Sequence, residues 1–284
     1  MCSRKYKEIN LCRISTLRSK EVAYFLGVMA TDGNLYICKN GSERLSIFVQ
    51  EKDRDWLIKV RNIFTDENPI KVRKVKKSRY VGFSITQKGL ADALDVHGII
   101  ENKSHTIKFP KKMPKKLLPH FIRGCFDGDG SITFKRSEAR QAYIQTVKFI
   151  SGSKEFLEGL QEVLSKKGIN TSLCTEKRKK PRQDLHRLHI MKDSLGKMYD
   201  YMYKDSKTCL LRKKKIFKKL LKYREKYKNG VQERHRRLNK ILTKSYFKKS
   251  RSKITGKVQV RSIARRLKVD KSTVYRHMKK LGVT

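Results

Sequence analysis

Two aspartates close apolar stretches that look like buried helices, and these acids are the residues best suited to chemistry. Asp32 ends VAYFLGVMATDG and Asp129 ends FIRGCFDGDG, so each carboxylate falls at the C-terminal end of a predicted helix. An acid placed there faces the negative end of the helix dipole, which costs up to about 1 kcal/mol. An ordinary glycine helix stop explains Gly33 and Gly130 but not the acids. A local rule broken twice at equivalent places suggests a functional site.

Small residues indicate how the two helices meet. Gly27 and Thr31 lie four positions apart in the first helix, and Gly124 and Gly128 have the same spacing in the second. Such pairs allow two helix backbones to approach closely. If the helices pack side by side in parallel, both carboxylates arrive at one point, where a divalent cation relieves their repulsion. Beside a basic surface, this arrangement predicts metal-assisted hydrolysis of a phosphodiester.

The charge of the chain indicates its partner. The 284 residues include 71 Lys and Arg against 26 Asp and Glu, a formal net charge of +45. A charge this large predicts nucleic acid as the partner. The sequence has no apolar run of membrane-spanning length and no basic amphipathic surface helix, which argues against a membrane.

The expected location is inside the cell. The N-terminus lacks the apolar core of a signal peptide, and the six cysteines are scattered without a CxxC pair. We therefore expect reduced thiols and an intracellular protein that is not secreted and stays with the DNA. Its compartment would be the cytoplasm or nucleoid of a bacterial or phage host, or an organelle.

The chain divides unevenly. Residues 204–284 carry 30 of the 71 basic residues but only 4 of the 26 acidic ones, and the two aspartates lie 97 positions apart within recurring elements. We predict an α+β fold of two pseudo-symmetric αββαββα repeats plus a small all-α domain. The predicted segments are a basic extension at 1–18, repeats at 19–110 and 111–222, a basic linker at 223–257 and a helix-turn-helix at 258–284.

Alternation along the strands predicts sheets with one apolar and one polar, basic face. The apolar face of the first repeat includes Leu35, Ile37, Leu45, Ile47 and Val49. The opposite face lacks acids, which favours contact with DNA over a merely solvated surface. The predicted DNA-binding residues are Asn34, Tyr36, Lys71, Arg73, Tyr80 and Ser84 in the first repeat, and Ser131, Thr133, Lys135, Arg187 and His189 in the second.

The C-terminal stretch from Val258 to Gly282 has the pattern of a helix-turn-helix. Its second helix opens with short polar side chains suited to base edges or phosphates. A helical dimerisation hairpin is the alternative. The expected small core is Ile263, Leu267, Val269, Val274 and Met278, and the expected DNA contacts are Lys271, Ser272, Thr273, Tyr275 and Arg276.

FLGVMATDG (25–33) and IRGCFDGDG (122–130) resemble the two signature helices of the LAGLIDADG homing endonucleases. The resemblance runs from about Ser19 to Leu221. It implies two repeats saddled over the DNA major groove and Mg²⁺ as cofactor, for which Mn²⁺ can substitute. It also implies metal binding by Asp32 and Asp129, helped by the backbone carbonyls of Thr31 and Gly128.

The same resemblance suggests supporting residues. Lysines near the end of each repeat order the water network in this family, and by position these are Lys103 and Lys213. Gln50 matches a polar residue near the active-site water. Asp127 fills the other acidic position of the motif, which Ala30 occupies in the first repeat. The resemblance does not make that position a metal ligand.

The leading hypothesis is a monomeric, site-specific endonuclease that makes double-strand breaks in a long DNA target. It would be intron-encoded or free-standing, and an intein host is not expected because no splicing-type residues flank the chain. One alternative is a non-catalytic transcription regulator with a LAGLIDADG-like domain, although the retention of both acids favours the enzyme. The other is an RNA maturase that binds its own intron RNA, which composition does not exclude.

Overall fold

Each acidic helix forms as predicted and leads directly into a strand. The computed structural model describes residues 8–139, 142–179, 181–204, 206–252 and 254–283, with the side chains of residues 231 and 235 left aside. Helix α2 spans Lys20–Thr31 and strand β1 spans Gly33–Ile37, while α5 spans Leu118–Asp129 and β5 spans Ser131–Ser137. The two predicted helix ends therefore lie one or two residues before a sheet begins.

Local sequence explains where α2 starts and why it is central. The Ser19 side chain accepts a hydrogen bond from the backbone N–H of Val22, and Glu21 lies in the first turn, as expected of a capped helix. Every residue from Val22 to Ala30 is buried. A helix that is apolar on all sides belongs in the interior of a protein. The amphipathic pattern of an ordinary surface helix is absent from α2 for this reason.

The first repeat has the predicted αββαββα order, preceded by a short helix. Its strands form one antiparallel sheet in the order β1-β2-β4-β3. The remaining elements are α1 (Leu11–Ser15), β2 (Glu43–Gln50), η1 (Glu51–Asp53), α3 (Arg54–Arg61), β3 (Lys71–Val75), β4 (Ser78–Thr86), α4 (Leu90–Asp95) and η2 (Lys103–His105).

The second repeat follows the same order, and its sheet has the equivalent arrangement β5-β6-β8-β7. This equivalence confirms the predicted α+β fold with two matching repeats. The remaining elements are β6 (Ala142–Ser151), α6 (Lys154–Ser165), β7 (Thr171–Glu176), β8 (Leu185–Ile190), η3 (Lys192–Ser194) and α7 (Leu195–Tyr203).

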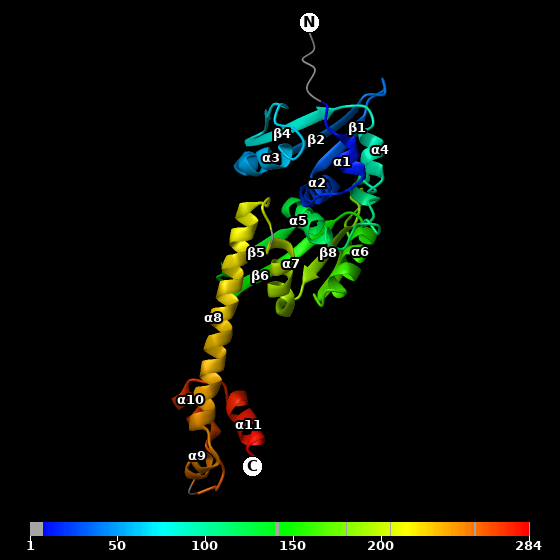
Figure 1. Cartoon of the computed structure of the whole chain (residues 1–284). Helices are drawn as coiled ribbons and strands as arrows, with labels where there is room; N and C mark the ends of the chain where they lie inside the picture. Colours follow the sequence, from blue (N-terminus) through cyan, green and yellow to red (C-terminus); the bar gives the residue numbers. More distant parts are fainter. Residues whose placement is uncertain (1–7, 140–141, 180, 205, 253, 284) are drawn as a thin grey trace. The chain divides into compact units, whose positions relative to one another are not determined.

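One continuous hydrophobic core serves both repeats. It runs from the apolar face of one sheet, through α2 and α5, to the apolar face of the other (Figure 1). Leu35, Leu45, Ile47 and Val49 are buried on the predicted face, whereas Ile37, at the end of β1, is 44% exposed. Because both acidic helices lie inside this core, the positions of their C-terminal ends are fixed from every side.

The chain separates into two units, one ending at Leu221 and the other beginning at Lys222. The second unit has its own core, in which Leu238, Leu242 and Phe247 join the predicted Ile263, Val274 and Met278. Part of the segment predicted as a linker is therefore folded, because its three large apolar side chains cover the helix pair. Its elements are the C-terminal part of α8 (Leu211–Ile241), then α9 (Lys244–Lys249), α10 (Val260–Leu267) and α11 (Lys271–Lys280).

The helix pair at the end of the chain agrees with the predicted pattern. Helices α10 and α11 are separated by a three-residue turn in which Lys268 has a φ of 51°. Leu267 and Val269 pack against the core, and Ala264 is buried in it. Among the described residues, none of the helices has the length and apolar character needed to cross a membrane.

Candidate active site

The two acidic helices pack with their backbones in contact. A Cβ placed on Gly124 would lie 2.9 Å from the Cα of Gly27, and one on Gly27 would lie 2.9 Å from the backbone nitrogen of Cys125. Each hypothetical Cβ would also clash with a backbone carbonyl of the other helix, that of Phe121 or Tyr24. Glycine is therefore required at both positions, which explains the small-residue spacing read from the sequence.

The same close packing continues to the helix ends. A Cβ placed on Gly128 would lie 2.8 Å from the Cβ of Thr31 and 3.2 Å from Oδ2 of Asp32. Asp32 is the residue that caps α2, and Asp129 is the last residue of α5. The structure thus brings both predicted acids to neighbouring helix ends.

The surroundings of the two carboxylates raise the pKa of both. Burial, together with the nearby charge of Asp129, raises the pKa of Asp32 to about 6, although Lys213 and Lys103 act in the opposite direction. Desolvation by the surrounding protein also raises the pKa of Asp129, and the same two lysines oppose the shift. Part of the Asp129 side chain is nevertheless exposed to solvent, whereas Asp32 is half-buried. The site therefore holds two closely spaced acids whose repulsion a cation would relieve.

The glycines after the acids do not act as predicted. Neither Gly33 nor Gly130 has a positive φ, and Gly130 is extended at φ −66° and ψ 145°. The helices end where predicted, but neither end uses the left-handed glycine that is usual at such a stop. A Cβ on Gly33 would lie 2.6 Å from the Cα of Met29, and one on Gly130 would lie 2.7 Å from Cγ of Phe126. Glycine is needed because the chain passes directly over the last helical turn.

Both predicted lysines are buried beside the acids. The Nζ of Lys103 donates a hydrogen bond to the carbonyl oxygen of Gly33. Burial lowers the pKa of Lys103, although the charges of Asp129 and Asp32 act to raise it. This lysine comes from η2, near the end of the first repeat. It therefore reaches the end of α2 from an element outside the sheet.

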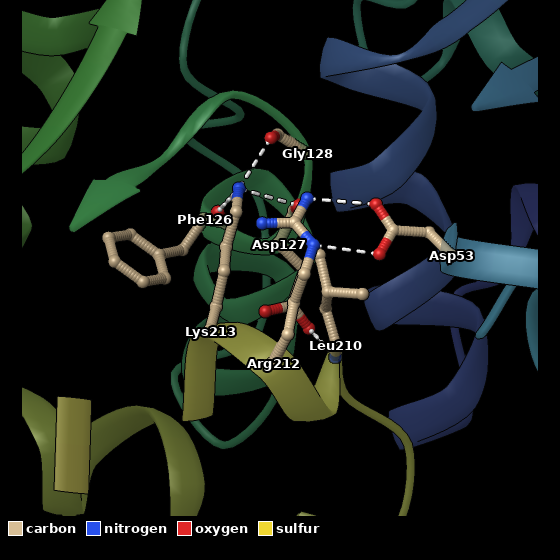
Figure 2. Close-up of polar contacts among 7 residues, drawn as sticks. All are labelled: Asp53, Phe126, Asp127, Gly128, Leu210, Arg212 and Lys213. Carbon is tan, nitrogen blue, oxygen red and sulfur yellow. Dashed lines mark hydrogen bonds and ion pairs between the residues drawn. The ribbon is translucent and has the colours of Figure 1, made fainter. Parts of the chain in front are cut away.

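Lys213 has a more extensive set of partners. Its Nζ donates hydrogen bonds to the carbonyl oxygens of Phe126 at 2.8 Å, Asp127 at 2.7 Å and Gly128 at 2.6 Å (Figure 2). All three carbonyls lie in the last turn of α5, where partners within the helix run out. The carbonyl of Phe126 also accepts a hydrogen bond from the backbone N–H of Gly130. Burial lowers the pKa of Lys213 to about 8, partly offset by Asp127. An ammonium group thus caps α5 next to Asp129.

The donor set fits a hard divalent cation. Carboxylates and backbone carbonyls are the ligands that Mg²⁺ accepts, with further positions filled by water or phosphate. Among the described residues, no cluster of three or more His, Cys, Asp and Glu side chains is suited to a metal. A cation here would therefore depend on Asp32, Asp129, backbone oxygens and the phosphates of a bound polymer. The carbonyl of Gly128, one predicted ligand, already accepts a hydrogen bond from Lys213.

Asp127 anchors the second motif from within. Its carboxylate accepts hydrogen bonds from the hydroxyls of Tyr24 at 2.6 Å and Tyr203 at 3.1 Å, and from the backbone N–H of Leu210 at 2.8 Å. Only 2% of Asp127 is exposed, and burial raises its pKa. The side chain joins α2, α7 and the start of α8. It holds the helices in place and does not face the space between Asp32 and Asp129.

An ion pair at the same site was not predicted. Arg212 donates two hydrogen bonds to Asp53, from Nε to Oδ1 at 2.7 Å and from its terminal nitrogen to Oδ2 at 2.8 Å (Figure 2). The two residues are 159 positions apart. No local pattern links them, and Arg212 stands in a run of basic residues. The sequence offered one signal for this pair: Asp53, three positions after Gln50, is an acid in a chain that has few acids.

Gln50 and Ser151 each end the second strand of a repeat, but the strand registers do not make them equivalent. Gln50 lies four positions after the partner of Asn34, whereas Ser151 lies three positions after the partner of Ser131. Gln50 ends β2, is exposed and lies opposite Tyr80 in the strand register, while Ser151 ends β6. The Ser151 hydroxyl accepts a hydrogen bond from the backbone N–H of Ser153. Gln50 thus lies at the sheet end nearest η1, and the described contacts include none between its side chain and either acid.

The polar face of the first sheet is continuous across its strands. Residues directly opposite in neighbouring strands point to the same face. Asn34 lies opposite Ser46, which lies opposite Ser84, and Gln50, Tyr80 and Arg73 form a second row. The Arg73 guanidinium also stacks 4.0 Å from the centre of the Phe48 ring. The other predicted contacts, Tyr36 and Lys71, are exposed on the same face.

The second sheet presents a more mixed face. Ser131, Lys148, His189 and Ser172 form one row, and Thr133 lies opposite Thr146. Arg187, a predicted DNA contact, is ion-paired with Glu176 on the neighbouring strand. This acid makes the second face less uniformly basic than the first. Lys135 remains exposed.

In the second unit, the predicted DNA contacts lie on α11. Lys271, Ser272, Tyr275 and Arg276 are exposed, with Tyr275 57% exposed, while Thr273 is half-buried. The buried residues of this helix, Val274 and Met278, pack into the core on its other side. Helix α11 therefore offers a polar, basic surface to solvent.

Fold and site together define a protein of two αββαββα repeats that brings two acids together at the ends of paired helices. Residues 118–202, from the start of α5 almost to the end of α7, match the model of the LAGLIDADG-like domain. This stretch of the chain, which contains the second motif, is therefore similar to a LAGLIDADG-like domain, in agreement with the resemblance noted for that motif. The first repeat shares the element order and sheet arrangement of the matched one.

Sequence comparisons also find two longer proteins. The chain is 29% identical over 232 residues to a probable translation initiation factor IF-2 from Methanocaldococcus jannaschii, a match that covers 78% of this chain and 17% of that protein. It is 31% identical over 151 residues to elongation factor 2 from Methanopyrus kandleri, which covers 52% and 10% respectively. The chain therefore spans a small part of the length of these curated relatives.

Solved structures with some similarity include two homing endonucleases. The meganuclease I-SmaMI bound to uncleavable DNA has a TM-score of 0.49 and 14% identity, with 74% of this chain and 94% of that chain covered. I-DmoI in complex with DNA and Ca has a TM-score of 0.42 and 17% identity, with 68% and 90% covered.

Proposed function

We propose that this protein is a site-specific endonuclease that cuts both strands of a long DNA target with the help of a divalent metal, Mg²⁺ or, in its place, Mn²⁺. The observation that carries the proposal is the meeting of Asp32, Asp129, Lys103 and Lys213 at the adjoining ends of α2 and α5. These two acids and two buried ammonium groups suit the cleavage of a phosphodiester. A helix end with a purely structural role needs none of them.

The acids would hold the cation. Asp32 and Asp129 supply hard oxygen ligands, and the backbone carbonyls of Thr31 and Gly128 lie beside them in the chain. When bound, a divalent metal supplies a lowered pKa for bound water and stabilisation of charge on the leaving oxygen. Although the pKa of Asp32 is raised, its value of about 6 still lies below neutral pH, so the carboxylate is largely ionised there and can bind a cation.

The two lysines would exchange protons and stabilise negative charge on the phosphate. The Lys213 ammonium, with a pKa lowered to about 8, is poised to exchange a proton close to physiological pH. The Lys103 ammonium is held at the end of α2 by its bond to Gly33. Each positive group lies close enough to both acids to influence their ionisation. Both can therefore stabilise negative charge that develops on a phosphate during cleavage.

The remaining predicted residues would bind the DNA. The polar faces of the two sheets would lie along the major groove, and α11 would enter a groove of its own. Phosphate contacts fix the position of a protein on DNA, while base contacts give specificity. We propose a monomer, encoded by an intron or free-standing, that remains with the DNA. Binding of its own intron RNA, as in a maturase, is the second candidate, favoured by the same large positive charge.

A randomised duplex library tests the proposal. The protein is incubated with the library and Mg²⁺, and any cleaved ends are sequenced, with parallel reactions in EDTA and Ca²⁺. We expect one recurring double-strand cut with Mg²⁺, none with EDTA, and binding with poor turnover in Ca²⁺. Tight binding to one sequence without cutting under any divalent metal would identify a regulator instead. Preferential capture of intron RNA without DNA cleavage would identify a maturase.

A further inference from the structure

The strongest unexplained contact in the first unit is the ion pair between Asp53 and Arg212. Its two parallel hydrogen bonds, 2.7 Å and 2.8 Å, have the forked geometry in which arginine binds a carboxylate best. Asp53 is only 7% exposed, whereas the Arg212 side chain is 43% exposed. One partner is therefore a buried acid, which needs a hydrogen-bonded positive partner to be tolerated.

The pair connects parts of the chain that no other described ion pair connects. Asp53 ends η1, which follows β2 in the first repeat, and Arg212 is the second residue of α8, which follows the second repeat. A neighbouring pair provides a contrast, because Glu51 makes a forked contact, at 2.6 Å and 3.2 Å, with Arg54 only three positions away. Glu51 also lies 4.0 Å from Arg79 of β4, within the same repeat. The Glu51 pair closes one helical turn, while the Asp53 pair holds the first repeat to α8.

Arg212 lies between two other attachments of α8 to the active-site helices. Two positions before it, the backbone N–H of Leu210 donates to Asp127, and directly after it Lys213 donates to the three carbonyls at the end of α5 (Figure 2). The first turn of α8 is thus held on one side by α5 and on the other by Asp53. The position of the Lys213 ammonium depends on both attachments.

We propose that the Asp53–Arg212 pair is a positioning latch that fastens α8 to the first repeat and so holds Lys213 at the end of α5 beside Asp129. Asp53 and Arg212 are positioning residues here, since they act through Lys213. Misplacement of a catalytic group by about 1 Å can lower the rate on the order of 10²-fold, so a contact that fixes the position of Lys213 can affect the rate of cleavage. The cleavage part of this inference rests on the proposed nuclease function.

The first test measures Lys213 without reference to activity. Full-length protein is treated briefly with an amine-acetylating reagent, and modification of Lys213 is quantified by fragmentation mass spectrometry. We expect Lys213 to be protected in the unaltered protein and to be modified about 5-fold faster or more in Asp53→Asn and Arg212→Gln, as a loss of about 1 kcal/mol of local stability would produce. Glu51→Gln, which breaks the local forked pair on the same element, is the matched control and should leave Lys213 protected.

The second test separates positioning from folding and from binding. On a cleaved duplex, Asp53→Asn and Arg212→Gln should lower kcat by about 10-fold or more while Kd for DNA in Ca²⁺ changes by less than about 2-fold, because neither residue is placed on a DNA-binding face. Arg212→Lys keeps the charge but not the fork, so it should restore part of kcat. Glu51→Gln should behave as the unaltered protein does.

The outcomes are distinct. If Asp53→Asn and Arg212→Gln lower the Tm but leave Lys213 modification and kcat unchanged, the pair is only a structural brace and the inference is overturned. If the unaltered protein cuts no DNA but the variants expose Lys213, the latch stands and the proposed function fails. If Lys213 is equally reactive in all proteins, the latch fails whatever the nuclease assay shows.

Discussion

The C-terminal ends of α2 and α5 carry the same Asp-Gly step, yet they are held in different ways. At the end of α2, Asp32 lies one residue beyond the helix and a single lysine, Lys103, contacts the following carbonyl. At the end of α5, Asp129 is still helical and Lys213 caps three carbonyls.

The two helices also differ at the position two residues before the proposed metal-binding aspartate of the motif. Asp127 anchors α5 through three hydrogen bonds, whereas Ala30 occupies the equivalent place in α2. The repeats therefore match in fold but not in chemical surroundings, and we expect the two acids to serve the two DNA strands unequally.

Disrupting the close packing of α2 against α5 should have the largest effect, because both helix ends depend on it. Gly27→Ala or Gly124→Ala would push the helix backbones apart, because each new Cβ meets backbone atoms of the other helix. Overpacking of this kind destabilises a protein by about 1–3 kcal/mol, and by more where the backbone itself must move. Chemical denaturation should show a large loss of stability together with loss of cleavage. Gly196→Ala, at a helical glycine with nothing within 4 Å, is the matched control and should be neutral or stabilising.

Unequal lysine contacts predict unequal effects of removing them. Lys213→Met should lower kcat by about 10²-fold or more and should lower the Tm further than Lys103→Met does. The reason is that three buried carbonyls lose a charged donor in one variant and one carbonyl does in the other. Single-turnover cleavage and thermal melting of both variants measure the difference. Equal losses in rate and Tm would show that the two helix ends are equivalent after all.

The raised pKa of Asp32 predicts a pH-dependent stability. Its folded pKa of about 6 lies above the ordinary value of 3.8 for an aspartate, so folding favours the protonated form. The stabilising contribution of Asp32 is present below about pH 4 and is lost as the pH rises toward 6. In EDTA, the Tm of the unaltered protein relative to Asp32→Asn should fall across that window, and Mg²⁺ should reverse the trend. A pH-independent difference between the two proteins would contradict the shifted pKa.

Loss of the second unit should have the smallest effect on the chemistry. A chain ending near Lys222 keeps both acids, both lysines and both sheets, so it should still cut, with weaker binding and relaxed discrimination at one flank. Each lost phosphate contact should make the slope of log K against log salt shallower by about 0.9. Footprinting of the full and shortened proteins on one site checks the geometry. Equal protected lengths would leave dimerisation or another partner as the role of α10 and α11.

The features that sequence predicted were those set by local pattern. The two motifs and the strand alternation predicted the two acidic helices, the two sheets and the helix-end positions of Asp32 and Asp129, because each pattern depends on neighbouring residues. The Asp53–Arg212 pair was not predictable, since it joins residues 159 positions apart in a chain full of arginine and lysine. Leu238, Leu242 and Phe247 were missed because three apolar residues dispersed in a basic stretch give no clear helical period.

Strand-resolved cleavage by the Asp32→Asn and Asp129→Asn variants tests the central claim most directly. A duplex of the cognate site, labelled differently on each strand, is incubated with each protein in Mg²⁺, and DNA affinity is measured separately in Ca²⁺. Both variants should lose double-strand cleavage while Kd changes by less than about 2-fold, because the acids hold the metal and the DNA contacts lie elsewhere. Any residual nicking should fall on different strands in the two variants. Full double-strand cutting by either variant would contradict the account of two cooperating acids.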